Sequence, residues 1–428
     1  MLLHPAHHVS GTVTVPSDKS ISHRSVIFGS IAEGTTRVKN CLFSADCLST
    51  ISCFKQMGIR ITKEEGSGDL FVEGKGLDGL KAPQEVLDTG NSGTTTRLLA
   101  GLLSGQEFPS TLSGDASLNS RPMKRVLTPL TEMGADIKSR ENNGCAPLDI
   151  RPSHLHGIHY QMPIASAQVK SCLLLAGLYA DSPVTVTEPA PSRDHSERML
   201  SAFGASISKQ GLDVSIQPRP VLHAQEIDVP GDISSAAYFI AAALLLKGSS
   251  LLIRNVGINP TRAGILTVCE KMGADIKKKN EREVSGEPVC DLLVKSSFLH
   301  GTVMEGDMIP SLIDEIPILA VMAALSEGET IIRDAADLKA KETDRIHTTA
   351  ENLKAMGADV VPTEDGFLIH GKKSLHGANL ESFEDHRIAM AFTIAALCAD
   401  GDSQMSHPDC VRISWPSFYE SLEKILVK

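Results

Sequence analysis

The phrase CEKMGADI at residues 269–276 recurs along the chain as FKQMGIRI at 54–61, LTEMGADI at 130–137, LSAFGASI at 200–207 and LKAMGADV at 353–360. In each copy an apolar pattern of helical period runs up to a glycine, as Ile265, Val268 and Met272 do before Gly273. A glycine just past a helix can adopt the left-handed conformation without a Cβ clash. Each phrase therefore predicts a helix that ends at its glycine and is followed at once by a short strand.

A second short strand is expected after a polar turn in every copy, at 70–72, 148–150, 213–216, 291–294 and 367–369. The final stretch SFYESLEKIL at 417–426 is interpreted as the helix of a sixth copy. Repeats of this length occur in solenoids, but the insertions between these copies are long and carry distinct polar motifs.

Two similar polar stretches, VPSDKSISHR from Val15 and VPGDISSAAY from Val229, place Val-Pro and a small residue before a predicted helix. We interpret them as two crossings of the chain between domains, which together would form a hinge. The predicted domains are an inserted one at 20–230 and a discontinuous one at 1–15 plus 232–428, each with three repeats.

The overall composition argues against several classes of function. One Trp, four Tyr and a formal net charge of −11 disfavour a nucleic-acid partner or an anionic membrane surface. The most apolar run, AAYFIAAALLL at 236–246, is too short to span a bilayer. Nine scattered Cys without a CxxC, and an N-terminus unlike a signal peptide, predict a cytoplasmic protein with reduced thiols. A monomer is the default expectation.

Two motifs between the repeats combine small polar residues with cations. In PSDKSISHR at 16–24, Lys19, Ser20 and Arg24 are expected near a helix N-terminus, where free N–H groups favour an anion. TGNSGTTTR at 89–97 is a small-residue turn whose backbone N–H groups can approach a ligand closely. Taken singly, such a motif is more often a capped surface helix or an ordinary turn.

Other runs add cations of the kind that bind carboxylates and phosphates. The candidates are Arg121, Arg193, Lys341, Arg345 and Arg387, together with Gln168 and Lys170 in front of an apolar helix. Each basic run could alternatively be a surface ion-pair cluster.

Three carboxylates are also candidates for chemistry. Asp314 and Glu315 interrupt the apolar stretch IPSLIDEIPILAVMAAL, where an acid is costly unless it is paired or functional. Glu342 lies among Lys341, Asp344 and Arg345. For Asp314 the alternative is an ordinary acid at a helix N-terminus.

In this order, DKSxSHR, GNSGTxxR, RPM, SAQxxK, IDE, KETDR and DHR resemble the motifs of the EPSP synthase family of enolpyruvyl transferases. The resemblance covers Pro16 to about Pro416, and SAQVK and RDHSE are similar to its class II branch. It implies two inside-out α/β domains, each of three βαβαββ units around buried helices and joined by a two-strand hinge. The substrates would bind in the cleft between the domains.

The resemblance also implies the reaction and its residues. The enolpyruvyl group of phosphoenolpyruvate would pass to the 5-hydroxyl of shikimate 3-phosphate, releasing phosphate through a tetrahedral intermediate, on the pathway to aromatic amino acids. Neither a metal nor a redox cofactor is expected. Shikimate 3-phosphate would be held by Lys19, Ser20, Arg24, Ser166, Ala167 through its backbone, Gln168, Arg193, Asp314 and Lys341. Phosphoenolpyruvate would be held by Lys19, Gly93, Arg121, Gln168, Arg345 and Arg387, with Asn91 and Thr94 in the same loop as Gly93.

Asp314 is expected to take the hydroxyl proton, and Glu342 to handle protons at C3, with Lys19 as its competitor. Glyphosate, which resembles phosphoenolpyruvate but is longer, is a possible inhibitor because Gly93 carries no side chain. At the place where class I members carry a Lys, this chain has Ile413 beside Arg412, which leaves the role of Arg412 open.

Two other functions are compatible with parts of the sequence. UDP-N-acetylglucosamine enolpyruvyl transferases share the fold and chemistry, but they usually carry a Cys where this chain has GDASLNSRPM. A non-catalytic repeat scaffold would explain the repeat, but not the acids and bases placed between the copies.

Overall fold

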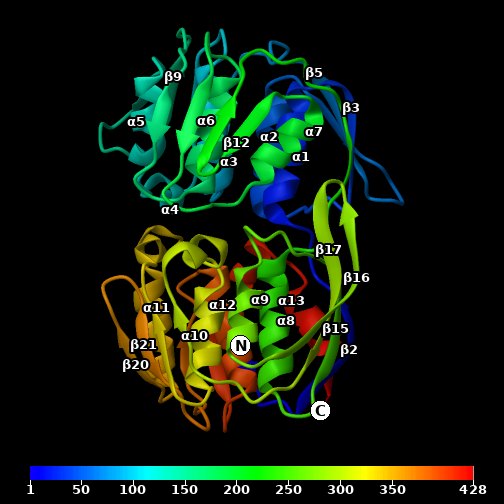
Figure 1. Cartoon of the computed structure of the whole chain (residues 1–428), viewed down its shortest axis with the longest axis vertical. Helices are drawn as coiled ribbons and strands as arrows, with labels where there is room; N and C mark the ends of the chain where they lie inside the picture. Colours follow the sequence, from blue (N-terminus) through cyan, green and yellow to red (C-terminus); the bar gives the residue numbers. More distant parts are fainter. Residues whose placement is uncertain (428) are drawn as a thin grey trace. The chain divides into compact units, whose positions relative to one another are not determined.

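The computed structural model describes residues 1–427. Its chain forms two compact units (Figure 1): unit 1 comprises Met1–Pro16 and Pro230–Lys428, and unit 2 comprises Ser17–Val229. Among the described residues, no helix combines the length and the apolar character that a membrane crossing requires.

Unit 2 is a series of short strands and helices. Its strands are β3 (Glu33–Lys39), β4 (Arg60–Lys63), β5 (Leu70–Lys75), β6 (Leu87–Asp88), β7 (Ser110–Ser113), β8 (Asp136–Ser139), β9 (Leu148–Arg151), β10 (His159–Gln161), β11 (Val184–Thr187), β12 (Ile207–Gln210), β13 (Asp213–Ile216) and β14 (Glu226–Asp228). Its helices are α1 (Lys19–Ile31), α2 (Ala45–Gln56), α3 (Gly93–Ser104), α4 (Ala116–Asn119), α5 (Lys124–Glu132), α6 (Ala167–Gly177) and α7 (His195–Phe203).

Unit 1 is also built from short strands and helices. Its strands are β1 (Leu2–Leu3), β2 (His8–Thr14), β15 (Ser250–Gly257), β16 (Asp275–Val284), β17 (Glu287–Lys295), β18 (Val303–Met304), β19 (Glu329–Ile332), β20 (Asp359–Pro362), β21 (Phe367–His370), β22 (Asn379–Glu381), β23 (Ser403–Ser406) and β24 (Leu426–Val427). Its helices are α8 (Ile233–Leu245), α9 (Gly264–Lys271), α10 (Ile316–Ala324), α11 (Arg345–Ala355), α12 (His386–Leu397) and α13 (Phe418–Glu423), with 3₁₀ helices η1 (Gly306–Ser311), η2 (Ala336–Ala340) and η3 (Pro408–Ile413).

The predicted βαβαββ repeat is confirmed, and its sheets have a common topology. Strand orders such as β6-β7-β9-β8, β10-β11-β13-β12 and β18-β19-β21-β20 place a parallel pair beside an antiparallel hairpin. The parallel pair needs a crossover connection, which a buried helix supplies. The hairpin follows the amphipathic helix that ends at the repeated glycine.

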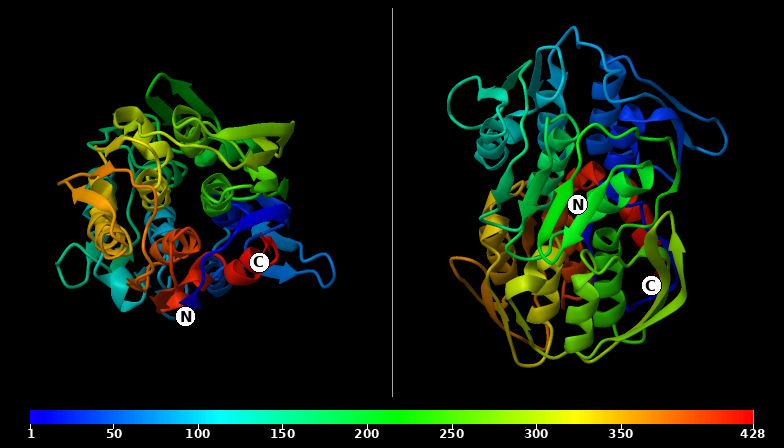
Figure 2. Two further views of the ribbon diagram at one scale, coloured as in Figure 1. Left: turned by 90° about the horizontal axis from the view of Figure 1, so that it is seen from below. Right: turned by 45° about the horizontal axis from the view of Figure 1, so that its top comes forward.

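At the two crossings, the opening strand of a repeat is supplied from a distant part of the chain. In unit 2, β14 runs parallel to β3, pairing Glu226 with Arg37. In unit 1, β2 runs parallel to β15, pairing Ser10 with Ser250. Each crossing therefore leaves a strand in one unit and enters a helix of the other unit. Both chain ends lie in unit 1, where β24 pairs with β2 (Figure 2).

The glycines of the repeat have the predicted conformation. Their φ angles are positive, from +78° at Gly357 to +106° at Gly204. The residue after each glycine donates its N–H to a carbonyl five residues earlier, as Ala274 does to Cys269 at 2.9 Å. A further contact recurs with these glycines and was not predicted. A residue that follows a buried Leu donates its backbone N–H to the carbonyl of the residue before the glycine, as His300 does to Met272 at 2.9 Å.

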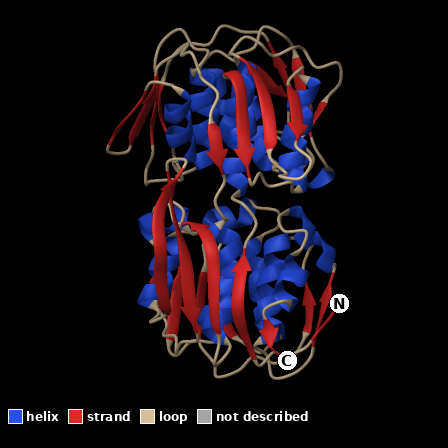
Figure 3. Cartoon of the chain, turned by 90° about the vertical axis from the view of Figure 1, so that its right-hand side faces the viewer, coloured by secondary structure: helices blue, strands red, loops and turns tan. Residues whose placement is uncertain are grey.

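Three helices of each unit are buried on nearly all sides, with the sheets outside them (Figure 3). In unit 2 these are α1, α3 and α6, and in unit 1 they are α8, α10 and α12, whose members contact one another. A helix that is apolar all round must lie in a core. The inside-out arrangement implied by the family resemblance is therefore observed within each unit.

The end of the chain differs from its prediction. The predicted last helix at 417–426 is shorter, because α13 ends at Glu423 and Leu426 pairs with Val9 of β2. In the sheet of the sixth copy, one strand comes from the N-terminus: β1 pairs antiparallel with β23.

Candidate functional site

The predicted site residues gather where the buried helices begin. In unit 2, Lys19 and Ser20 start α1, Gly93 and Thr94 start α3, and Ala167 and Gln168 start α6. In unit 1, Asp314 lies two residues before the first residue of α10, and Arg387 lies in the first turn of α12. Such ends present free N–H groups and a partial positive charge, which suit anions.

At the start of α1, Asp18 caps the helix through a 2.9 Å hydrogen bond from the Ile21 N–H. The Lys19 ammonium lies 2.9 Å from the Asp46 carboxylate of α2, with 20% of the lysine side chain exposed. Lys19 was predicted to face an anion together with Ser20 and Arg24. In the structure its ammonium is paired with Asp46, which the sequence analysis did not identify.

Arg24 is buried and binds across three helices. Its Nε donates to Ser196 of α7 at 2.7 Å, and its Nη2 donates to Ser171 of α6 at 2.8 Å. Its Nη1 donates to the Ser20 carbonyl at 3.0 Å. This arginine therefore holds the starts of α1, α6 and α7 in one arrangement.

A buried chain of hydroxyl contacts connects α1 to the cap of α3. His23 Nδ1 is 2.7 Å from Thr50 Oγ1, which is 2.7 Å from Thr95 Oγ1. Thr95 Oγ1 in turn contacts Ser92 Oγ, the N-cap of α3, at 2.7 Å. Burial lowers the pKa of His23 to about 3, so this imidazole is neutral at physiological pH.

The loop at 89–97 is joined to the SAQVK segment by hydrogen bonds. Arg97 Nη1 donates to Gln168 Oε1 at 2.6 Å, and Gln168 Nε2 donates to Thr94 Oγ1 at 3.1 Å. Ser166 caps α6 by accepting from Val169. Of these residues, Thr94, Ser166 and Gln168 were predicted site residues, whereas Arg97 was not.

Arg121 approaches the same loop from the other side. Its Nη2 donates to Asn91 Oδ1 at 2.5 Å, and its Nη1 donates to the Asn91 carbonyl at 3.3 Å. Asn91 donates to Asp115 at 2.8 Å. Two predicted site residues, Asn91 and Arg121, are thus in contact.

In unit 1, Asp314 is surrounded by three predicted cations. Lys341 Nζ and Arg345 Nη1 lie 3.6 and 3.5 Å from its Oδ1, and Arg387 Nη2 lies 3.7 Å from its Oδ2. Only 13% of the Asp314 side chain is exposed. The IDE, KETDR and DHR motifs, which lie far apart in sequence, therefore meet at one carboxylate.

Arg345 is the most constrained of these cations. Its Nε donates to Asp385 at 2.8 Å and its Nη2 to Glu342 at 2.5 Å. Burial alone would lower the pKa of Arg345, but the charges of Asp385 and Glu342 raise it well above its ordinary value. Asp385 also caps α12, so one carboxylate fixes both Arg345 and the helix that carries Arg387.

Two other predicted residues have less defined surroundings. Arg193 is half-buried in the loop before α7. Arg412, whose role was left open, lies in η3 with 73% of its side chain exposed, and it pairs with Asp409 at 3.8 Å.

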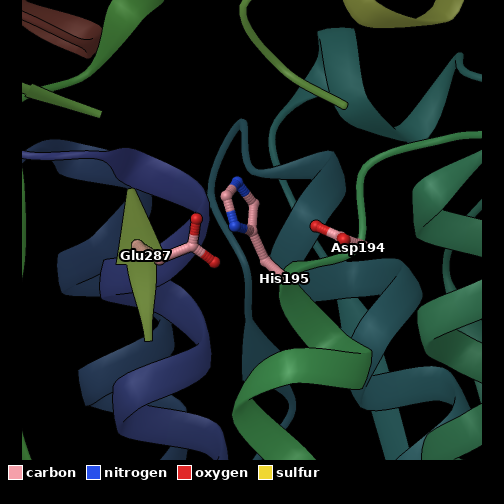
Figure 4. A group of neighbouring side chains, drawn as sticks. All are labelled: Asp194, His195 and Glu287. Carbon is pink, nitrogen blue, oxygen red and sulfur yellow. The ribbon is translucent and has the colours of Figure 1, made fainter. Parts of the chain in front are cut away.

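Figure 4 shows Asp194 and His195 at the start of α7, where Arg198 donates to Asp194 at 2.9 Å. It also shows Glu287 of β17, whose carboxylate accepts from Asn259 at 2.9 Å. Since Glu287 belongs to unit 1 and the other two residues belong to unit 2, we assign no metal site to them.

Asp46, Arg97 and Asp385 were not among the predicted site residues. Arg97 and Asp385 lie inside the motifs GNSGTxxR and DHR, so their position beside predicted residues was available as a signal. Asp46 had no comparable signal, because its contact with Lys19 depends on how α2 packs against α1.

Comparisons with known proteins agree over nearly the whole chain. The model of the family EPSP synthase (3-phosphoshikimate 1-carboxyvinyltransferase) matches residues 3–422. Relatives with that name from Brevibacillus brevis and Bacillus licheniformis are 53% and 52% identical, over 98% of this chain and 98% of each of theirs. EPSP synthase from Acinetobacter baumannii has a TM-score of 0.88 and 44% identity, covering 100% of this chain and 98% of its own.

A protein with lower sequence identity has a similar fold. The enolpyruvyl transferase NikO from Streptomyces tendae has a TM-score of 0.79 at 18% identity, over 99% of this chain and 96% of its own. At this identity the likeness concerns the fold alone. The motif order, the repeat and the full-length match to the family model lead to one conclusion: this chain belongs to the EPSP synthase family.

Proposed function

We propose that this protein transfers the enolpyruvyl group of phosphoenolpyruvate to the 5-hydroxyl of shikimate 3-phosphate and releases phosphate, with its site divided between the two units. Family membership supports the reaction. The observation that carries the assignment of residues is the meeting of Lys341, Arg345 and Arg387 around Asp314. A scaffold has no need of an acid held among three cations.

Both substrates carry phosphate and carboxylate groups, so the site must supply positive charge despite a net charge of −11. Arg345 and Arg387 are proposed to bind phosphoenolpyruvate from unit 1, and Arg121, Gly93 and Gln168 from unit 2. Asp385 and Glu342 hold Nε and Nη2 of Arg345, so Nη1, which lies 3.5 Å from Asp314, is the nitrogen proposed to donate to the anion.

Shikimate 3-phosphate is proposed to bind Ser20, Arg24, Ser166, Ala167 and Arg193 in unit 2, and Lys341 and Asp314 in unit 1. Lys19 is proposed to touch both substrates. Three helix N-termini in unit 2 supply N–H groups in addition to these side chains.

The proposed chemistry uses the acids as proton carriers. The 5-hydroxyl oxygen forms a bond to C2 of phosphoenolpyruvate while its proton passes to Asp314. C3 gains a proton, for which Glu342 is the proposed donor and Lys19 the alternative, giving the tetrahedral intermediate. C3 then loses a proton, the C2–O bond to phosphate breaks, and the C2–C3 double bond re-forms. Exclusion of water from the site would strengthen the electrostatic interactions in these steps.

Three further properties are part of the proposal. The protein is a monomer, and its nine Cys suit the reducing cytoplasm. Glyphosate is proposed to bind in place of phosphoenolpyruvate.

The test is a phosphate-release assay with shikimate 3-phosphate and phosphoenolpyruvate, repeated with UDP-N-acetylglucosamine as acceptor. Release with the first acceptor alone is expected. Two results would contradict the proposal: phosphate release with UDP-N-acetylglucosamine but not with shikimate 3-phosphate, and no phosphate release with either acceptor. Asp314→Ala is the matched variant, because its loss of activity assigns the phosphate release to this site.

A further inference from the structure

A buried ion cluster in unit 2 takes no part in the proposed chemistry. Lys170 Nζ lies 2.7 Å from Glu188 Oε2 and 2.6 Å from Glu197 Oε1, and the three side chains are 0, 1 and 8% exposed. Apart from this contact with Lys170, neither Glu197 oxygen accepts a hydrogen bond within residues 1–427. The charge of Lys170 is therefore what compensates the Glu197 carboxylate.

The cluster encloses one loop. Glu188 directly follows β11, and Glu197 lies in the first turn of α7. The Glu188 carboxylate also accepts from the Ser192 N–H at 3.2 Å and from the Ser192 hydroxyl. The Lys170 ammonium of α6 therefore contacts the carboxylates that flank residues 189–196 on both sides. Arg193 follows Ser192 within this segment.

A second contact joins the same two helices through the sequence neighbours of Lys170 and Glu197. Ser171 Oγ of α6 and Ser196 Oγ of α7 are 2.6 Å apart, and both bind Arg24. The start of α6, which carries Gln168, is therefore tied to the start of α7 by two adjacent buried contacts. The loop with Arg193 has little freedom to move relative to Gln168 and Arg24.

Stability does not explain such a cluster. A buried ion pair about breaks even against apolar residues of similar volume, and here two carboxylates share one cation. Buried polar groups of this kind are best attested as devices that specify one geometry.

We propose that Lys170, Glu188 and Glu197 are positioning residues that fix Arg193 for binding shikimate 3-phosphate. The inference rests on the proposed function, since it needs Arg193 to contact that substrate. It adds three residues that do not touch substrate themselves.

The experiment is a double-mutant cycle between Glu188→Ala and Arg193→Ala, read as KM for shikimate 3-phosphate and kcat. Glu188→Ala leaves Lys170 paired with Glu197, so the protein is expected to fold. Its KM should rise about tenfold with kcat within about threefold, since the lost positioning weakens one charged contact. In the Arg193→Ala background it should add no more than about twofold, because coupled residues are not additive. Glu188→Gln, which keeps an acceptor for Ser192, should recover part of the lost affinity.

Leu200→Ala is the control, because Leu200 is a fully buried core residue of the same helix α7. It should lower the melting temperature but leave KM unchanged. A normal KM in Glu188→Ala, effects that multiply in the double mutant, or a normal KM in Arg193→Ala would each overturn the proposal.

Hydrogen exchange of the Arg193 and Asp194 amides gives a measure that needs no substrate. Faster exchange in Glu188→Ala than in Leu200→Ala supports the positioning role, and equal exchange overturns it. Absence of phosphate release in the wild type would instead refute the proposed function, so the two failures are distinguishable.

Discussion

Replacing Gly93 by alanine tests how the 89–97 loop discriminates between anions. Gly93 begins α3 without a positive φ, so alanine fits the backbone. A Cβ at this position would lie 2.8 Å from Arg97 Nη1 and 3.7 Å from Arg121 Nη1. The methyl group thus meets Arg97, which donates to Gln168 at 2.6 Å.

The size of the effect follows from these contacts. Overpacking costs about 1–3 kcal/mol, and a charged hydrogen bond that must shift is worth about 1.5–3 kcal/mol. Because Arg97 ends in a flexible guanidinium, we expect the lower end of this range. That corresponds to about a tenfold loss in kcat/KM for phosphoenolpyruvate. The longer glyphosate should lose more, since it needs the space that the methyl and the displaced arginine occupy.

Steady-state kinetics with glyphosate as inhibitor measure both effects. The wild type should be inhibited competitively with phosphoenolpyruvate, and Gly93→Ala should raise the glyphosate Ki more than the KM. Arg97→Lys removes the atom that the methyl meets, so the double variant should be no worse than Arg97→Lys alone. A wild type already resistant, equal losses for both ligands, or losses that multiply in the double variant would refute this reasoning.

Four other predictions concern unit 1 and the hinge. Asp314→Ala should lower turnover in the phosphate-release assay by about 10²-fold or more, because a general base is lost, and its circular dichroism spectrum should be unchanged. Near-normal turnover would show that Asp314 is an ordinary acid at a helix N-terminus. Arg345→Ala should raise the KM for phosphoenolpyruvate about tenfold or more, and an unchanged KM would remove it from the substrate. Asp385→Asn should cost about 3–5 kcal/mol of unfolding free energy at neutral pH in urea melts, because it leaves Arg345 buried without its main partner. Burial alone would raise the pKa of Asp385, but the charge of Arg345 lowers it below 3.8, so the stabilisation is full above that pH. The deficit of Asp385→Asn should shrink as pH falls below that value, and a constant deficit would point to a cause other than charge. Shikimate 3-phosphate should reduce the radius of gyration in small-angle scattering, whereas an unchanged profile at saturation would argue against closure at the two crossings.

Local patterns explain why much of the fold could be predicted. The apolar period, the glycine and the following strand are neighbours in sequence, and all five predicted hairpins are present. The pairings of β14 with β3 and of β2 with β15 could not be predicted from local patterns, because they join residues far apart in the sequence, such as Glu226 and Arg37. The charged run KKKNERE at 277–283 lies within the exposed strand β16. The turn itself is formed by Ser285 and Gly286, both with positive φ.

The same distinction applies to the site. The motifs indicated which residue types stand at helix starts, since capping and dipole effects act within a turn. They could not indicate which acid pairs with each cation, because these contacts join separate helices. Lys19 contacts Asp46 of α2, and Arg345 contacts Asp385 at the start of α12.

The distances in unit 1 separate two kinds of cation. The contacts from Arg345 to Glu342 and Asp385, at 2.5 and 2.8 Å, are ordinary or short hydrogen bonds that fix the guanidinium. The three ion-pair contacts to Asp314, at 3.5 to 3.7 Å, are longer than ordinary hydrogen bonds. Arg345 is therefore preorganised, and it can bind an anion without first losing its orientation. In the proposed mechanism, an arriving anion could draw Lys341 and Arg387 toward itself from these long contacts with Asp314. We propose that this difference in distance suits Arg345 to substrate binding and Asp314 to proton transfer.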